Sequence, residues 1–197
     1  QERINTIKKY HSLFPDNKNK ILGEASVSYL FYRDVPEKIR SYNQEAKIII
    51  MLRNPIDRAF SHYLMDLRLG FVNNDFDEII EKGKIDKSLN LFYQQYVEVG
   101  LYYKQVKRYL DTFGNKNTLI IFHQDFKRDL ESVLFRVYQF LNINKNFKNK
   151  IRAKHNAYIM PKSTILKKIY SIAFFRKIIN KFIPKGVVKK IGVLFET

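Results

Sequence analysis

The stretch KIIIMLRNPIDRAFSHY, Lys47 to Tyr63, decides the fold. Residues 48–52 form an unbroken run of Ile, Met and Leu, which is typical of a strand buried on both faces. Arg53 ends this run and Asn54-Pro55 follows, with Asn54 suited to cap a helix and Pro55 suited to its first position. The stretch therefore predicts a buried strand that delivers an arginine to the start of a helix.

Similar patterns along the chain predict the other elements. A second apolar run, NTLIIF at residues 117–122, indicates another buried strand. Helices are expected over residues 4–14, 35–42, 55–69, 76–82, 96–113, 130–141 and 163–183, and several of them are followed by glycine. Two buried strands separated by helices indicate an α/β fold with a parallel sheet and right-handed crossovers. Two strands are too few for a complete doubly wound sheet.

The composition is that of one globular domain. The chain has 197 residues, 45% of them hydrophobic, which is enough for a core. It contains no cysteine, which fits a reducing, cytoplasmic location. It has no apolar run long enough for a transmembrane helix, and its first residues lack the features of a signal peptide.

The net charge of +17 is concentrated in the C-terminal third. No Asp or Glu occurs from Ser132 to Phe195, a segment with 15 Lys and Arg residues. Such a block attracts phosphate, sulfate, anionic glycan, nucleic acid or acidic lipid, although a solvated lysine-rich face has the same composition. Residues 162–197 are predicted to be a basic amphipathic helical segment. It either belongs to the domain or lies peripherally on an anionic membrane surface.

Arg53 is the first candidate for binding chemistry. In parallel sheets, ligands bind beyond the carboxyl ends of the strands, and the following helix offers free N–H groups and its positive dipole end. Together they predict an anion site, with phosphate as the usual occupant. Ser61, eight residues later, reaches the same anion only if the ligand lies along the helix flank. Asp57–Ser61 and Arg58–His62 are one turn apart. The spacing equally allows Arg53 to cap the sheet only, with surface charges at 57 and 58.

The string RNPIDRAFSHY also resembles the 3′-phosphate-binding motif of sulfotransferases that use PAPS (3′-phosphoadenosine 5′-phosphosulfate). The resemblance implies that Arg53 and Ser61 bind the 3′-phosphate of this sulfuryl donor, without a metal. Four further segments are similar to bacterial and glycan sulfotransferases and keep the family order: GEASVSYLF (23–31), VGLYYKQVKRYL (99–110), LIIFHQDFKRD (119–129) and VYQFLNI (137–143). The implied fold is a three-layer, P-loop-NTPase-like parallel sheet flanked by helices.

The chain departs from the family pattern in its glycines. The family's 5′-phosphosulfate loop is rich in Gly, Thr and Ser, whereas this chain has seven glycines and none in a Gly-rich loop. Ala25 stands where some relatives have a lysine. We therefore expect residues 1–161 to be a sulfotransferase domain, incomplete at its N-terminus or diverged, with an incomplete sheet.

The sequence assigns no catalytic base. His123 follows the second strand at the ligand edge, and Glu24 is a weaker candidate; the family motif supports neither. His62 is expected to pack or face solvent. Lys154 lies in a basic loop, residues 152–162, which is either a solvated loop or, as the resemblance implies, one that closes over the nucleotide.

The implied reaction is sulfuryl transfer to a hydroxyl or amine of a glycan or small molecule. The alternative is a non-catalytic basic remnant that binds anionic membrane or glycan. Nucleic-acid binding ranks third because no nucleic-acid motif is present.

Overall fold

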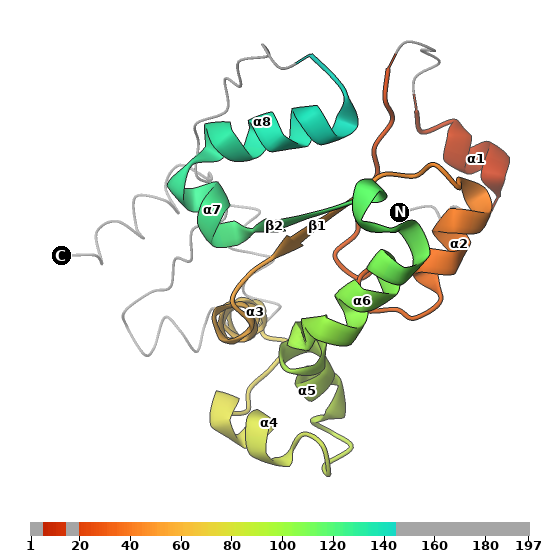
Figure 1. The fold of residues 1–197 in the computed structure, drawn as a ribbon. Coiled ribbons are helices and arrows are strands. Elements are labelled where there is room, and N and C mark those ends of the chain that lie inside the picture. Colours follow the sequence, from red (N-terminus) through yellow and green to blue (C-terminus); the bar gives the residue numbers. More distant parts are fainter. Residues whose placement is uncertain (1–5, 15–19, 145–197) are drawn as a thin grey trace, which may run out of the picture.

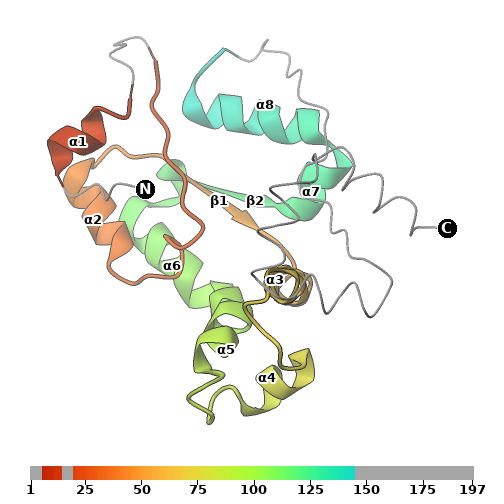
Figure 2. The same ribbon diagram turned by 180° about the vertical axis from the view of Figure 1, so that it is seen from behind.

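The computed structural model describes residues 6–14 and 20–144, and its two strands form a parallel pair (Figures 1 and 2). The elements are α1 (Ile7–His11), α2 (Val35–Tyr42), β1 (Ile48–Leu52), α3 (Pro55–Leu69), α4 (Phe76–Lys82), α5 (Asn90–Tyr96), η1 (Glu98–Gly100), α6 (Tyr102–Phe113), η2 (Asn115–Asn117), β2 (Thr118–Phe122), α7 (His123–Arg128) and α8 (Leu130–Leu141). The expected helix at 163–183, Lys154 and the boundary at 161/162 lie outside the described residues.

The sheet is the middle of three layers, as expected. β1 and β2 run parallel in register, from Ile48 opposite Thr118 to Leu52 opposite Phe122. α6 packs against both strands on one face, and α8 packs against β2 on the other, as Figure 1 shows. The core on the α6 side includes Ile50, Leu52 and Tyr109.

The expectation that β1 is buried on both faces is wrong within the described residues. Ile50 and Leu52 are buried, but the alternate residues Ile49 and Met51 are 41% and 50% exposed. Side chains alternate between the two faces of a strand, and α8 lies over β2 rather than β1. An unbroken apolar run therefore does not establish that helices cover both faces.

The helix predicted over 96–113 is confirmed over residues 102–113 as α6, but its predicted start is wrong, because the chain breaks between α5 and α6. Leu101, with φ −80° and ψ 70°, leaves helical geometry between η1 and α6. The buried side-chain amide of Gln105 donates to the carbonyls of Glu98 and Leu101, at 3.0 and 3.1 Å. A side chain from the first turn of α6 thus satisfies backbone groups that a continuous helix would have paired internally.

A second core lies beyond the sheet, where α3 packs against α4 and α5. It contains Ala59, Tyr63, Val72, Ile79 and Tyr96. α3 therefore faces this helical cluster on one side. Only two residues separate its first residue from the end of β1, so the cluster holds the helix that starts at the carboxyl edge of the sheet.

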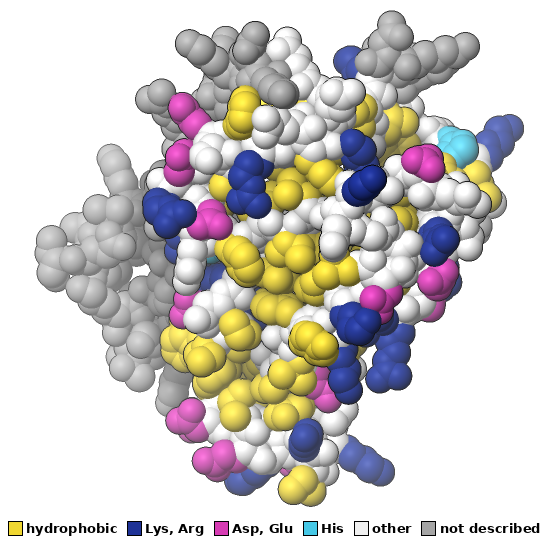
Figure 3. Space-filling model, in the orientation of Figure 1, with side chains coloured by type: hydrophobic (Ala, Val, Ile, Leu, Met, Phe, Trp, Pro, Cys, Tyr) yellow, Lys and Arg dark blue, Asp and Glu magenta, His cyan; other side chains and the backbone are white. Residues whose placement is uncertain are grey.

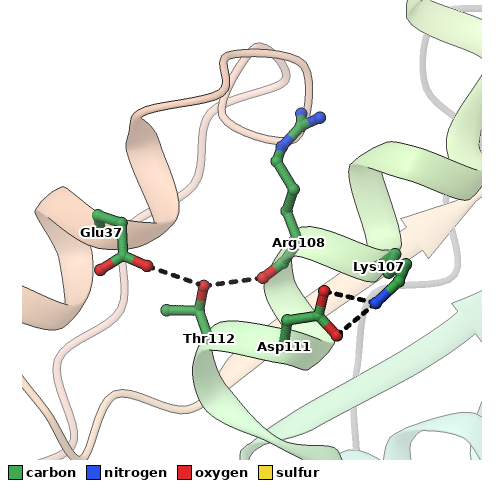
Figure 4. Close-up of polar contacts among 5 residues, drawn as sticks. All are labelled: Glu37, Lys107, Arg108, Asp111 and Thr112. Carbon is green, nitrogen blue, oxygen red and sulfur yellow. Dashed lines mark hydrogen bonds and ion pairs between the residues drawn. The ribbon is translucent and has the colours of Figure 1, made fainter.

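Polar contacts at the surface tie α2 to α6 (Figure 4). The hydroxyl of Thr112 lies 2.8 Å from the Arg108 carbonyl and 3.4 Å from the Glu37 carboxylate, while Lys107 pairs with Asp111 one turn away. Such exposed pairs contribute little to stability. The face in Figure 3 shows acidic and basic side chains interspersed. The strongly basic third of the sequence lies almost entirely outside the described residues.

Candidate functional site

The carboxyl ends of β1 and β2 bring Arg53 and His123 to the same edge of the sheet. Leu52, the last residue of β1, pairs with Phe122, the last residue of β2. Arg53 and His123 directly follow these two residues, so they leave the sheet side by side. Both side chains are partly exposed. Within the described part of the chain, no carboxylate forms an ion pair with Arg53. A guanidinium with several free donors at this edge is suited to bind an oxyanion.

The start of α3 differs from the expectation that free backbone N–H groups would bind the anion. Asn54 caps the helix as predicted, and its side-chain oxygen accepts from the N–H groups of Ile56 and Asp57 at 2.9 and 3.2 Å. The Arg58 N–H donates to the Asn54 carbonyl, and Pro55 has no N–H. All first-turn donors are therefore used, so this helix start offers an oxyanion its dipole but no free first-turn N–H group.

Ser61 is exposed on α3, on the face opposite the buried residues Ala59 and Tyr63. It lies about 9 Å along the helix axis from Pro55. A ligand that touches both Arg53 and Ser61 must therefore lie along the exposed flank of α3, as the sequence required.

His123 shares the electrostatic environment of Arg53. Burial and the nearby cations Lys127 and Arg53 lower the pKa of His123, and Asp57 opposes this shift. Asp57, in the first turn of α3, thus lies close enough to affect a side chain that follows β2. A neutral imidazole at this edge can accept a proton, and a bound dianion would favour its protonated form.

Glu24, the other candidate base in the sequence, is engaged in hydrogen bonds that make it less suited to accept a proton from an acceptor. Its two carboxylate oxygens accept hydrogen bonds from the hydroxyls of Tyr10 (2.5 Å) and Tyr29. The bond to Glu24 raises the pKa of Tyr10 to about 12. The carboxylate joins α1 to the turn before α2, which indicates a structural role.

Arg58 and His62 both contact Tyr96 of α5, and His62 therefore packs against the protein, as expected. Arg58 donates from Nη2 to the Tyr96 carbonyl at 2.6 Å. His62 Nε2 lies 3.7 Å from Asp66 Oδ2, and its ring packs edge-on against Tyr96. Burial lowers the pKa of His62 despite Asp66, and Arg58 adds to the lowering. Arg58, His62 and Asp66 are spaced four residues apart and lie along one side of α3. Sequence reasoning did not predict that all three would contact α5, although their spacing indicates that they share a face.

Residues 6–14 and 20–144 contain neither a candidate membrane span nor a candidate metal site. None of the helices there combines the length and apolarity that a membrane span requires. The same residues contain no group of three or more His, Cys, Asp or Glu side chains arranged to bind a metal.

Comparison with known proteins gives one consistent answer. A model of the sulfotransferase domain matches residues 12–191. Carbohydrate sulfotransferase 15 of Mus musculus is 28% identical over 163 residues, which are 66% of this chain and 29% of that protein. Luciferin sulfotransferase of Photinus pyralis is 30% identical over 124 residues, covering 63% and 31%. Heparan sulfate glucosamine 3-O-sulfotransferase 3B1 of Homo sapiens is 26% identical over 141 residues, covering 69% and 35%.

Among solved structures, a sulfotransferase from Alicyclobacillus acidocaldarius superimposes with a TM-score of 0.69 and 33% identity, covering 90% of this chain and 70% of that chain. The chain spans about a third of the length of the curated relatives that it matches.

Proposed function

We propose that this chain, which belongs to the sulfotransferase family, transfers a sulfuryl group from PAPS to a hydroxyl or amine of an acceptor. The observation that carries the proposal is Arg53 at the carboxyl end of β1, level with His123 and without a carboxylate partner among the described residues. That position supplies a forked cation where ligands of parallel sheets bind.

The residues at this edge fit the 3′-phosphate of PAPS. In our proposal, Arg53 donates to the phosphate oxygens and the exposed Ser61 hydroxyl donates to the same ligand along the flank of α3. Because the backbone donors of α3 are already used, the affinity for phosphate depends on these side chains. When bound, PAPS supplies the sulfuryl group that is transferred.

The acceptor is proposed to be a glycan or a small molecule. Support comes from the names of the relatives, which are a carbohydrate sulfotransferase, a heparan sulfate glucosamine sulfotransferase and a luciferin sulfotransferase. Sulfuryl transfer requires a base for the acceptor proton. His123 lies beside Arg53, at the 3′-phosphate end of the donor in this proposal, so we leave the base for the acceptor unassigned.

The test is transfer of labelled sulfate from PAPS to a panel of glycans with free hydroxyls or glucosamine amines and to small phenols. We expect label on at least one acceptor class and loss of that label with Arg53→Ala. Arg40→Ala is the matched control, because Arg40 lies on α2 and donates to the Thr112 carbonyl, away from the strand ends. Transfer that is equal in wild type and Arg53→Ala would refute the assignment.

A further inference from the structure

Arg58 joins the first turn of α3 to the turn that precedes α6. Its Nη2 donates to the Tyr96 carbonyl at 2.6 Å, and its side chain is largely withdrawn from solvent. Tyr96 is the last residue of α5, so this contact reaches the carbonyl groups that the helix end leaves unpaired. One arginine thus fastens the helix at the ligand edge to the η1 region.

The buried glycine of η1 makes the closeness of this contact possible. A Cβ on Gly100 would lie 3.2 Å from Pro55 Cβ and 3.4 Å from Arg58 Nη2. Pro55 is the first residue of α3 and has a rigid ring, so it cannot move aside without the helix start moving too. The backbone of η1 therefore packs directly against Pro55, two residues after Arg53.

The charge of Arg58 is not explained by stability alone. Its Nε atom is buried without a hydrogen-bond partner among the described residues, and no carboxylate there forms an ion pair with it. Burial lowers the pKa of Arg58 and the nearby cation Arg53 adds to the lowering, whereas the nearby Tyr102 opposes it. A partly buried cation without a counter-ion carries a desolvation cost, which an apolar side chain of similar volume would avoid.

We propose that Arg58 is a positioning residue that, seated against Gly100, fixes the start of α3 and so sets the placement of Arg53 and Ser61. The proposal rests on the proposed function of those two residues as the 3′-phosphate site. Arg53 lies two residues before Pro55, and a small shift of the helix start moves the end of its long side chain further. Small displacements of a binding group reduce affinity steeply.

The test is a double-mutant cycle with Arg53→Ala and Arg58→Ala, measured as the affinity for PAP (3′,5′-adenosine bisphosphate) by calorimetry. If Arg58 acts through Arg53, Arg58→Ala weakens binding on the order of tenfold in wild type but by less than about threefold in the Arg53→Ala background. Full additivity would mean that Arg58 contacts the ligand independently, and an unchanged affinity would mean no role. Either result overturns the proposal.

Two further arms keep the proposal testable if Arg58→Ala does not fold or the wild type does not bind PAP. Gly100→Ala should weaken PAP binding in the same direction, while Gly23→Ala, in open space, should not. Amide hydrogen exchange of Ile56, Asp57 and Arg58 should become faster in Arg58→Ala or Gly100→Ala without ligand, with α6 unchanged. Wild type that fails to bind PAP refutes the proposed function, whereas unchanged exchange in the first turn of α3 refutes the positioning role.

Discussion

Arg58 and Tyr96 are joined by a 2.6 Å hydrogen bond from the guanidinium of one to the backbone carbonyl of the other. The hydroxyl of Tyr96 in turn donates to Asp66 Oδ2 at 2.9 Å, two turns further along α3. α3 therefore holds Tyr96 at both its backbone and its side chain. This double attachment explains how a helix that starts at an open sheet edge is held against the α5–α6 region.

Removal of the Tyr96 hydroxyl should destabilise the fold. Tyr96→Phe keeps the ring contacts with Tyr63 and Phe92 but leaves the buried Asp66 carboxylate without this donor. We expect a loss of about 1–3 kcal/mol in the free energy of unfolding, measured by urea denaturation. Tyr103→Phe is the control, since Tyr103 is 78% exposed. Equal stabilities of the two variants would contradict the role of this bond.

His62 should make stability fall in weak acid. Its pKa is lowered in the folded state from 6.5, chiefly by burial, so above that value both states hold a neutral ring. Below pH 6.5 the His62 ring is protonated in the unfolded chain but still neutral in the folded chain. The free energy of unfolding therefore decreases as the pH falls from 6.5 to the pKa of the folded state. The slope is at most about 1.4 kcal/mol per pH unit. Unfolding curves at several pH values should show this slope shrinking in His62→Gln; an unaltered slope would disprove the assignment.

Substitution of Gly114 should destabilise the fold through backbone strain and not through side-chain clashes. Its φ of 73° and ψ of 169° lie in a region that residues with a Cβ rarely adopt, although a Cβ there would meet no atom within 4 Å. Gly114→Ala is expected to cost about 1–3 kcal/mol. Gly23→Ala meets open space too, without a positive φ, and should be close to neutral. A thermal melt in which both variants match wild type would rule out strain at Gly114.

His123 should couple PAP binding to proton uptake. Its pKa is lowered by burial, Lys127 and Arg53, and a bound phosphate dianion raises it again, so affinity should increase as the pH falls. Phosphate itself titrates near pH 6, so the relevant quantity is the difference between wild type and His123→Gln. Calorimetry in buffers of different ionisation enthalpy counts the protons. Equal uptake by both proteins would exclude His123 from the site.

Much of the local structure at the ligand edge follows from short-range patterns. The apolar run before Arg53, the Asn54 cap with Pro55, and Gly70 with its φ of 70° at the end of α3 are each determined by neighbouring residues, and each is confirmed. The parallel pairing of two such strands follows from the same patterns.

The features that sequence reasoning missed depend on contacts between distant segments. Gln105 stabilises the break before α6 through its hydrogen bond to the Glu98 carbonyl. The close packing of η1 against α3 depends on Gly100. Helical periodicity carries no sign of either contact. Arg58 reads as a surface charge because its burial depends on α5 folding against α3. The occupied donors at the start of α3, in contrast, are a local consequence of the Asn54 cap and could have been predicted from it.

The most direct test of the central claim is calorimetric binding of PAP and of 5′-AMP to wild type and to Arg53→Ala, with Arg40→Ala as control. If Arg53 holds the 3′-phosphate, wild type prefers PAP, and Arg53→Ala loses about 1.5–3 kcal/mol of PAP binding free energy while its affinity for 5′-AMP is unchanged. PAP affinity that is equal in wild type and Arg53→Ala would contradict the account.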